Sequence, residues 1–307
     1  MSEPIISANL KTHRIRNCVI FLSCAVVLVL GVRWAQSQLT PPNGNDQALA
    51  TMDKAGCAEA GGAKICRANY VVDGKTVEAI SFEPKGAGPF PGVLLIPGYE
   101  RTARDIAPLG IRLSREGFAG LAVSQPGYGE SDGPADFVGP KTIAAMKAGY
   151  QRLRQEKYVD PKRMAIYGYS RGGMAASLLA VELDDLKAAV FGAGIYDFRR
   201  LYDDSTLMGV RFNMMAETGM TKEAVRVRSS ILRMDQLKCP VLILHGEKDK
   251  NVPVRQALLL RDKLTQLHKD FEIKLFPDKE HSIGPPAGDA AVDFFRRRLL
   301  TTSGPGQ

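Results

Sequence analysis

A serine lies between two closely spaced glycines in the middle of the chain, and this spacing is typical of a catalytic nucleophile. Gly168, Ser170 and Gly172 form the pattern G-x-S-x-G, which follows a short apolar run and precedes a helix-forming stretch. At so tight a turn from strand to helix, the serine adopts a strained conformation that holds its hydroxyl clear of the sheet. A side chain at either glycine would collide with the neighbouring strand or with the helix. The pattern therefore predicts nucleophilic catalysis by Ser170.

A serine hydroxyl becomes a good nucleophile only when a base accepts its proton, and imidazole has a suitable pKa. The chain has four histidines. His13 lies in the N-terminal segment, His268 lies at the polar end of a predicted helix, and His245 ends a predicted strand, where we expect a structural role. His281 lies in a polar loop after the last predicted strand, at the carboxyl edge of the sheet. Elimination therefore predicts His281 as the base.

The imidazole in turn needs a carboxylate that fixes its tautomer and stabilises its charged form. The turn after the predicted strand at 241–244 offers two carboxylates, Glu247 and Asp249. The turn and the Val-Pro pair after it favour Asp249, with Glu247 as the alternative. The predicted catalytic set is therefore Ser170, Asp249 and His281, in that order along the chain.

Negative charge develops on the substrate carbonyl oxygen during attack, so two fixed hydrogen-bond donors are needed beside the serine. The backbone N–H of Arg171 is one predicted donor of this oxyanion hole. The loop after the strand at 93–96 should supply the other, for which we prefer the N–H of Tyr99, with the N–H of Gly98 and the Tyr99 hydroxyl as alternatives. The glycine-rich stretch at 127–133 is expected near the site. It lacks the spacing of a phosphate-binding loop, so it implies no nucleotide.

The elements that would position these residues alternate along the chain, and this alternation favours a mostly parallel sheet covered by helices on both faces. We expect an α/β fold with about eight strands in residues 69–301, an opening hairpin at 71–82 that forms an antiparallel edge, and a small helical lid at about 196–238. Residues 302–307 are expected to be a flexible tail. The other predicted strands are 93–96, 119–123, 164–167, 186–191, 241–244 and 271–276, and the predicted helices are 104–115, 141–155, 173–182, 255–267 and 289–300.

Residues 1–37 have the features of a targeting segment. Basic residues precede an apolar run that ends in a small-x-small pattern, as in a secretory signal peptide. The alternative is an uncleaved membrane anchor through residues 17–33, although the run is a little short for a spanning helix. Either interpretation predicts export of the large domain, to the periplasm or beyond. Residues 38–68 are polar and rich in Pro, Gly and Ala, so we expect a linker.

Composition is that of a globular protein with a sizeable core. The 307 residues are 45% hydrophobic and carry a net charge of +8. The basic residues are scattered apart from a cluster at 296–298, which we interpret as the solvated face of a terminal helix and not as a nucleic-acid site. Cys57 and Cys66 are candidates for a disulfide outside the cytoplasm, with two unpaired thiols as the alternative. Cys239 is expected to be buried. No Cys/His spacing suggests a metal site, and we expect no cofactor.

Three segments together resemble a known family. They are Val159-Asp160-Pro161-Lys162-Arg163 leading into residues 168–173, the run 240–246 with Asp249 and Val252-Pro253, and the loop with Glu280 and His281. The chain resembles the prolyl oligopeptidase/dienelactone hydrolase branch of the α/β-hydrolases over about residues 70–300. The resemblance implies the α/β-hydrolase fold and serine hydrolase chemistry. We expect no β-propeller like that of prolyl oligopeptidases. The chain also has Ser where typical dienelactone hydrolases have Cys, and Pro97-Gly98 where many relatives have His-Gly.

We therefore expect an exported serine hydrolase that cleaves small or medium carboxylic esters through an acyl-enzyme on Ser170. A short-peptide hydrolase is the first alternative, followed by an acyltransferase or thioesterase. A binding protein that keeps the fold without catalysis is the remote alternative. The expected partner is a small-molecule ester or a short peptide, and no nucleic acid. The oligomeric state and the acyl specificity stay open.

Overall fold

The structure of the 307-residue chain is a computed structural model that describes residues 44–300. The predicted signal peptide or anchor at 1–37 and the predicted tail at 302–307 lie outside the described residues. The chain divides after Gln47, and the sheet and the site lie in the second unit. Within residues 44–300, no helix is long and apolar enough to cross a membrane.

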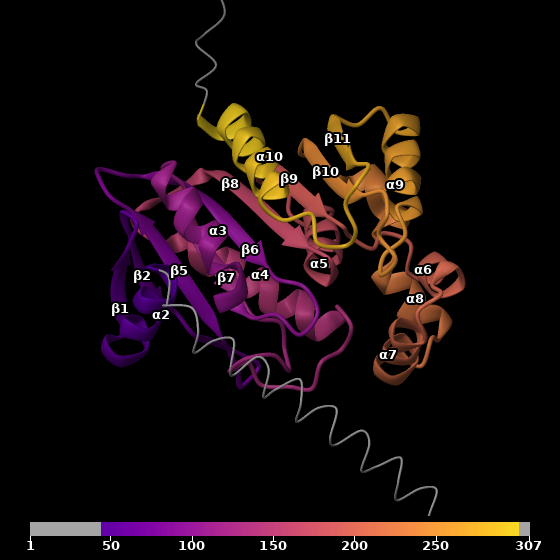
Figure 1. Cartoon of the computed structure of the whole chain (residues 1–307), viewed down its shortest axis with the longest axis horizontal. Helices are drawn as coiled ribbons and strands as arrows, with labels where there is room; N and C mark the ends of the chain where they lie inside the picture. Colours follow the sequence, from indigo (N-terminus) through magenta and orange to yellow (C-terminus); the bar gives the residue numbers. More distant parts are fainter. Residues whose placement is uncertain (1–43, 301–307) are drawn as a thin grey trace, which may run out of the picture. The chain divides into compact units, whose positions relative to one another are not determined.

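A nine-stranded sheet forms the centre of the fold, in the order β1-β2-β5-β7-β6-β8-β9-β10-β11 (Figure 1). The pairs from β7 to β11 are parallel, and β1, β2 and β5 add an antiparallel edge beside β7. The predicted fold class is therefore confirmed, with one strand more than expected. The strands are β1 (Cys57–Ala60), β2 (Ala63–Arg67), β5 (Ala79–Pro84), β6 (Phe90–Ile96), β7 (Ala119–Val123), β8 (Val159–Tyr169), β9 (Leu186–Gly192), β10 (Val241–Gly246) and β11 (Phe271–Phe276).

The predicted hairpin at 71–82 is present but does not form the sheet edge. Its strands β3 (Tyr70–Val72) and β4 (Lys75–Val77) turn at Asp73 and Gly74, both at positive φ, and make a separate two-stranded sheet. The chain then continues as β5, which pairs with β7 in the main sheet. The prediction merged β4 and β5 because a single residue separates them.

The segment predicted as a linker, 38–68, differs from that prediction over its described part. It contains helix α2 (Gly44–Ala55) and the hairpin of β1 and β2, and α2 buries Ala48, Leu49 and Met52. A disulfide joins Cys57 to Cys66, which are cross-strand partners in that hairpin. Strands of this length are too short to show a clear alternation of apolar and polar residues in the sequence. The disulfide and the packing against β5 stabilise them instead.

Helices cover both faces of the sheet and enclose two apolar cores. Alternate residues of β6 enter different cores: Leu94 and Ile96 lie in one, and Val93 and Leu95 lie in the other. The first core packs against α4 (Pro140–Gln155), α5 (Arg171–Ala180) and α9 (Arg255–Gln266). The second packs against α2, α3 (Ala103–Arg115) and α10 (Pro285–Phe295). Buried strands of this kind fix the carboxyl edge of the sheet, where the loops meet.

The predicted lid at 196–238 consists of short helices between β9 and β10: α6 (Phe198–Asp204), α7 (Met208–Thr218), α8 (Lys222–Arg228) and the 3-10 helix η1 (Ser230–Gln236) (Figure 1). Side-chain caps start two of them, because Asp197 accepts a hydrogen bond from Arg200 N and Thr221 accepts one from Ala224 N. Helix α7 ends at Gly219, which has the left-handed conformation of a helix C-cap.

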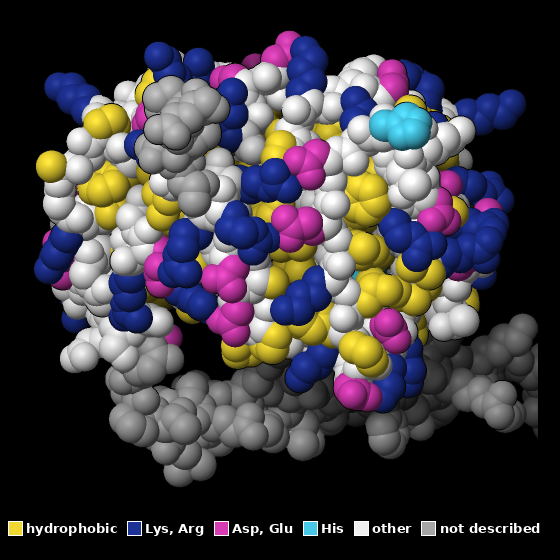
Figure 2. Space-filling view, turned by 90° about the horizontal axis from the view of Figure 1, so that it is seen from above, with side chains coloured by type: hydrophobic (Ala, Val, Ile, Leu, Met, Phe, Trp, Pro, Cys, Tyr) yellow, Lys and Arg dark blue, Asp and Glu magenta, His cyan; other side chains and the backbone are white. Residues whose placement is uncertain are grey.

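Charged side chains of both signs are interspersed over the face that Figure 2 shows. The basic cluster at 296–298 lies in η2 (Arg296–Leu300), a π-helical turn after α10. Its arginines pair with carboxylates of neighbouring elements: Arg296 with Glu116, Arg297 with Glu272 and Arg298 with Asp270. These exposed ion pairs agree with the interpretation of a solvated helix face.

Candidate active site

The turn between β8 and α5 has the strained geometry that its sequence predicts. Ser170 has φ 57° and ψ −122°, a conformation that a residue with a side chain rarely adopts. Its N–H donates a hydrogen bond to Gly192 O at 2.8 Å. A Cβ on Gly168 would lie 2.0 Å from Gly172 O, and a Cβ on Gly172 would lie 2.0 Å from Ile96 O. Only glycine therefore fits at either position.

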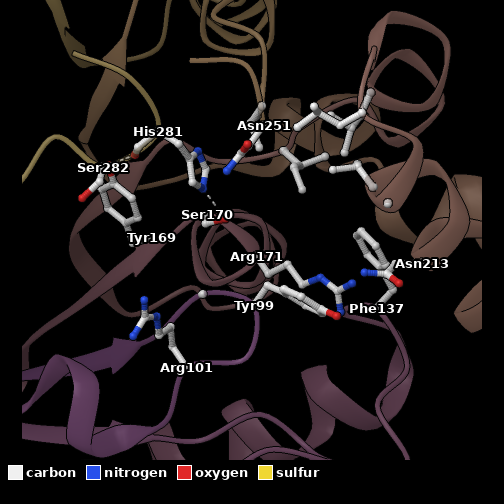
Figure 3. Close-up of a pocket in the computed structure, with 17 residues that line it drawn as sticks. Tyr99, Arg101, Phe137, Tyr169, Ser170, Arg171, Asn213, Asn251, His281 and Ser282 are labelled. Atoms are coloured by element: carbon white, nitrogen blue, oxygen red, sulfur yellow. Dashed lines mark hydrogen bonds between the residues drawn. The ribbon is translucent and has the colours of Figure 1, made fainter. Parts of the chain in front are cut away.

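The three predicted catalytic side chains form one hydrogen-bonded chain, of which Figure 3 shows the contact between His281 and Ser170. His281 Nε2 lies 2.8 Å from Ser170 Oγ, and His281 Nδ1 lies 2.7 Å from Asp249 Oδ2. The second oxygen, Asp249 Oδ1, accepts hydrogen bonds from Asn251 N and Val252 N, at 2.9 Å each. Glu247, the alternative acid, is exposed. The structure thus brings together the residues that a proton relay needs.

Burial alone would raise the pKa of Asp249, but hydrogen bonds from His245, His281 and the Val252 N–H lower it to about 2. The carboxylate therefore stays ionised across the neutral range. An ionised acceptor holds the His281 proton on Nδ1 and leaves Nε2 free to accept the serine proton.

His245, expected to be structural, lies against the acid of this relay. Its fully buried Nε2 is 2.8 Å from Val252 O and 3.4 Å from Asp249 Oδ2. Donation to the Val252 carbonyl places the imidazole proton on Nε2, facing the carboxylate as well. Its Nδ1 has no hydrogen-bond partner among the described residues. His245 lies near the end of β10, four residues before Asp249 in the chain.

The loop that carries His281 is fixed to the elbow by Tyr169, a contact that the sequence did not predict. The Tyr169 hydroxyl donates to His281 O at 2.5 Å and accepts from Ile283 N at 3.1 Å. The two rings also meet edge to face, with centroids 6.0 Å apart. Burial raises the pKa of Tyr169 to about 12, so the hydroxyl keeps its proton and remains a donor.

The predicted oxyanion residues lie on two segments beside Ser170. A Cβ on Gly98 would lie 3.1 Å from Ser170 Cβ, so this loop approaches the serine closely. The buried Gln125 donates a hydrogen bond from Nε2 to Pro97 O at 2.7 Å, which fixes the position of this loop. Arg171 is the first residue of α5, where backbone N–H groups have no acceptor within the helix.

A cavity of about 700 Å³ opens beside Ser170 and extends beneath the lid (Figure 3). The predicted residues Tyr99, Ser170, Arg171 and His281 all line it. Its lid side is apolar, and Asn213 and Asn251 add amide groups. The apolar side chains that line it are Phe137, Ile195, Leu201, Leu207, Val210 and Val252. No Asp or Glu lines the cavity among the described residues, and residues 44–300 hold no cluster of His, Cys, Asp and Glu suited to a metal ion.

Comparisons with known proteins show the family and the fold. The family model described as "Prolyl oligopeptidase family" matches residues 138–298. The uncharacterized peptidase YtmA of Bacillus subtilis (strain 168) is 30% identical over 222 residues, which cover 70% of this chain and 85% of YtmA. A probable dipeptidyl-aminopeptidase B of Aspergillus clavatus is 35% identical over 134 residues, 42% of this chain and only 14% of that protein.

Two solved structures show the same fold at lower identity. The acylaminoacyl peptidase of Pyrococcus horikoshii matches with a TM-score of 0.68 and 19% identity, over 80% of this chain and 43% of that one. The acetyl xylan esterase from Paenibacillus sp. R4 matches with a TM-score of 0.67 and 17% identity, over 85% and 96%. The chain thus spans most of YtmA and of the esterase but less than half of the acylaminoacyl peptidase. The resemblance noted in the sequence is confirmed: the chain belongs to the prolyl oligopeptidase family and is a hydrolase of the serine peptidase type with the α/β-hydrolase fold.

Proposed function

We propose that the protein is an exported serine hydrolase that cleaves carboxylic esters through an acyl-enzyme on Ser170. The observation that carries the proposal is the continuous chain from Asp249 through His281 to Ser170, with contacts of 2.7 and 2.8 Å. Heavy-atom distances of this size allow proton transfer without rearrangement of the side chains.

Each residue then has a defined task. Ser170 Oγ attacks the acyl carbonyl carbon as its proton passes to His281 Nε2, and Asp249 stabilises the imidazolium that forms. The backbone N–H groups of Arg171 and Tyr99 donate to the oxyanion. His281 returns the proton to the leaving alkoxide, and the ester is cleaved. Water, activated by the same imidazole, then attacks the acyl-enzyme and releases the carboxylic acid.

The lid side of the cavity favours an apolar acyl group, while Arg101, which pairs with Asp105, also lines the cavity. Its lid side is lined by aliphatic side chains of Leu201, Leu207 and Val210, and its volume of about 700 Å³ admits a medium acyl chain or an aromatic ring. An aminopeptidase must hold the ammonium group of its substrate, for which a carboxylate in the site is the usual partner. The absence of Asp and Glu from the described lining therefore supports an ester or a blocked acyl compound.

A short-peptide hydrolase is the second candidate, because YtmA and the dipeptidyl-aminopeptidase relatives carry peptidase names. The same relay cleaves amides when the site positions the leaving amine. Parallel assays with p-nitrophenyl esters and aminoacyl-naphthylamides rank the two candidates, and acyl thioesters extend the panel. We expect higher kcat/KM for the esters, and a preference for the amides would reverse the order.

Covalent labelling tests the nucleophile directly. A fluorophosphonate probe should label the purified protein. Ser170→Ala should abolish the labelling and should reduce the esterase activity by at least about 10³-fold. Ser282→Ala is the matched control, because this serine lines the same cavity without a hydrogen-bonded imidazole, and it should label normally. Full labelling of Ser170→Ala would exclude the proposed nucleophile.

Export is the part of the proposal that rests on residues 1–37 and on the Cys57–Cys66 disulfide. Disulfides persist in oxidising compartments and are rare in the cytosol. Fractionation of cells that express the full chain should place the enzyme outside the cytoplasm, and mass spectrometry of its N-terminus separates cleavage from anchoring. A reduced, cytoplasmic full-length protein would contradict this part.

A further inference from the structure

The side chain of Arg171 is buried beside the nucleophile although arginine carries a permanent charge. Its side chain is 5% exposed, and a buried guanidinium requires partners for its charge and its donors. Glu217, on lid helix α7, accepts two hydrogen bonds from it: Arg171 Nη2 donates to Oε1 at 2.8 Å and Nη1 donates to Oε2 at 3.1 Å. This is the bidentate geometry of a strong charge-assisted pair.

The guanidinium also contacts three aromatic side chains. Nη1 donates to the Tyr128 hydroxyl at 2.9 Å. The guanidinium carbon lies 4.3 Å from the centre of the Tyr99 ring and 3.6 Å from that of Phe137, within the range of cation–π attraction. Glu217 Oε2 accepts a further hydrogen bond from Phe137 N at 2.8 Å. One buried ion pair therefore joins the lid to two loops of the catalytic domain, the one between β6 and α3 and the one between β7 and α4.

Two of these residues are the proposed oxyanion donors. The backbone N–H of Arg171 lies at the start of α5, and the ring of Tyr99 packs on the guanidinium of the same Arg171. A shift of the guanidinium would therefore disturb both donors at once. Figure 3 shows the Arg171 side chain extending from the elbow toward Tyr99, Phe137 and Asn213. Glu217 itself does not line the cavity, so it reaches the substrate only through Arg171.

We propose that Glu217 is a positioning residue that couples the seating of the lid to the geometry of the oxyanion hole. When α7 is docked, its carboxylate holds the Arg171 guanidinium between the two rings and keeps the N–H groups of Arg171 and Tyr99 directed at the substrate carbonyl. When the pair is broken, the buried guanidinium lacks its counter-charge and both donors lose their support. The inference rests on the proposed function of Ser170 and deepens it.

The first test is the kinetics of Glu217→Gln with p-nitrophenyl esters. Loss of a whole oxyanion donor costs about 10²–10³ in kcat, and displacement of two donors that remain present should cost less, about tenfold. KM should stay within about threefold, because the interaction is strongest in the transition state. Binding of phenylboronic acid, which forms a tetrahedral adduct with a serine, should weaken by the same factor as kcat/KM.

Glu223→Gln is the matched control. Glu223 lies on lid helix α8 and pairs with Arg226 at 2.7 Å, but both side chains are about two-thirds exposed, at 66% and 65%. Exposed pairs contribute little, so this variant should retain the kcat and KM of the wild type. Glu217→Asp, which keeps the charge, should recover part of the kcat lost in Glu217→Gln. Thermal unfolding of each variant verifies that it folds.

A double-mutant cycle tests whether Glu217 acts through Arg171. In an Arg171→Met background, Glu217→Gln should cause no further loss of kcat, because the partner is already absent. Three results would overturn the inference: wild-type kcat in Glu217→Gln, a rise in KM at constant kcat, or an additive loss in the double variant. The outcome is separable from that of the proposed function, because Ser170→Ala tests the nucleophile and leaves this pair intact.

Discussion

The elbow at residues 168–172 and the lid at 196–238 border the same cavity but are built in opposite ways. At the elbow, backbone atoms of three segments approach so closely that a single added methyl group has no space. In the lid, short helices carry exposed apolar side chains, including Met208, Phe212 and Met215, which are 77%, 70% and 46% exposed. A Cβ added at Gly209 of the lid would meet nothing within 4 Å.

This difference indicates that the elbow and the lid have different roles. Reaction at an acyl carbonyl requires that the hydrogen-bond donors and the general base are placed to within a fraction of an ångström. The tight backbone packing at the elbow provides this rigidity. Selection among acyl groups requires only a wall of suitable shape, which short helices provide. The buried pair of Arg171 and Glu217 joins the elbow to the lid.

The largest effect is expected at the elbow glycine. Gly172→Ala places a methyl 2.0 Å from Ile96 O and 2.7 Å from Pro97 O, both of them backbone atoms. We expect a loss of about 3 kcal/mol or more in the free energy of unfolding, and loss of most activity, because the strand or the helix must shift. Gly209→Ala, in the lid, should be neutral or more stable by up to about 1 kcal/mol. Urea denaturation measures the free energy of unfolding of both variants. Equal changes in the two variants would contradict the proposed difference between the elbow and the lid.

The second effect concerns pH. The pKa of Asp249 is lowered from 3.8 to about 2 in the folded protein. The ionised carboxylate therefore stabilises the native state above about pH 4 by about 2 kcal/mol, and this contribution is lost as the pH falls toward 2. The stability gap between the wild type and Asp249→Asn should therefore stay constant above about pH 5 and shrink as the pH falls from about 5 toward 2. A gap that does not change with pH in urea denaturation would contradict the assigned pKa.

The third effect concerns acyl selection by the lid. Val210 on α7 lines the cavity, so Val210→Phe narrows the space for the acyl chain. The ratio of kcat/KM for p-nitrophenyl octanoate over acetate should fall by about tenfold, because the longer chain loses apolar contacts. Activity on the acetate should change little. An unchanged ratio would indicate that the acyl group binds elsewhere.

The smallest effect is expected on the outer side of the same helix. Phe212 is 70% exposed and does not line the cavity. Phe212→Ser should therefore change the free energy of unfolding by no more than about 0.5 kcal/mol. We expect the octanoate-to-acetate ratio to stay within about twofold, since this substitution leaves the cavity wall intact. The pair of Val210 and Phe212, two residues apart, thus separates the inner wall of the lid from its outer surface.

The candidate residues of the relay could be identified from the sequence because each lies in a constrained context. Ser170 lies between glycines that sterics require, and the chain offers few histidines from which to choose His281. Short elements could not be predicted from the sequence. The hairpin of β1 and β2 lies in a segment without periodicity, and its stability depends on packing and on the disulfide between Cys57 and Cys66.

The partner of Arg171 was not predictable either. Glu217 lies 46 residues away, in a region where only helical character was evident, and the contact depends on how α7 docks. His245 was interpreted as structural, since a sequence does not show that a strand end will bring a second imidazole against Asp249. Contacts between side chains of separate loops are set by tertiary packing and not by any local pattern.

The lid leaves the sheet after β9 and returns to it at β10, and these two strands are neighbours. An insert with both ends anchored on adjacent strands can be exchanged for another of different length without altering the register of the sheet. The segment between β9 and β10 can thus change in length while the sheet keeps its register. The carboxylate of Glu217 limits that freedom, because a replacement segment that lacks an acidic side chain at the matching place would leave Arg171, next to Ser170, without its counter-ion.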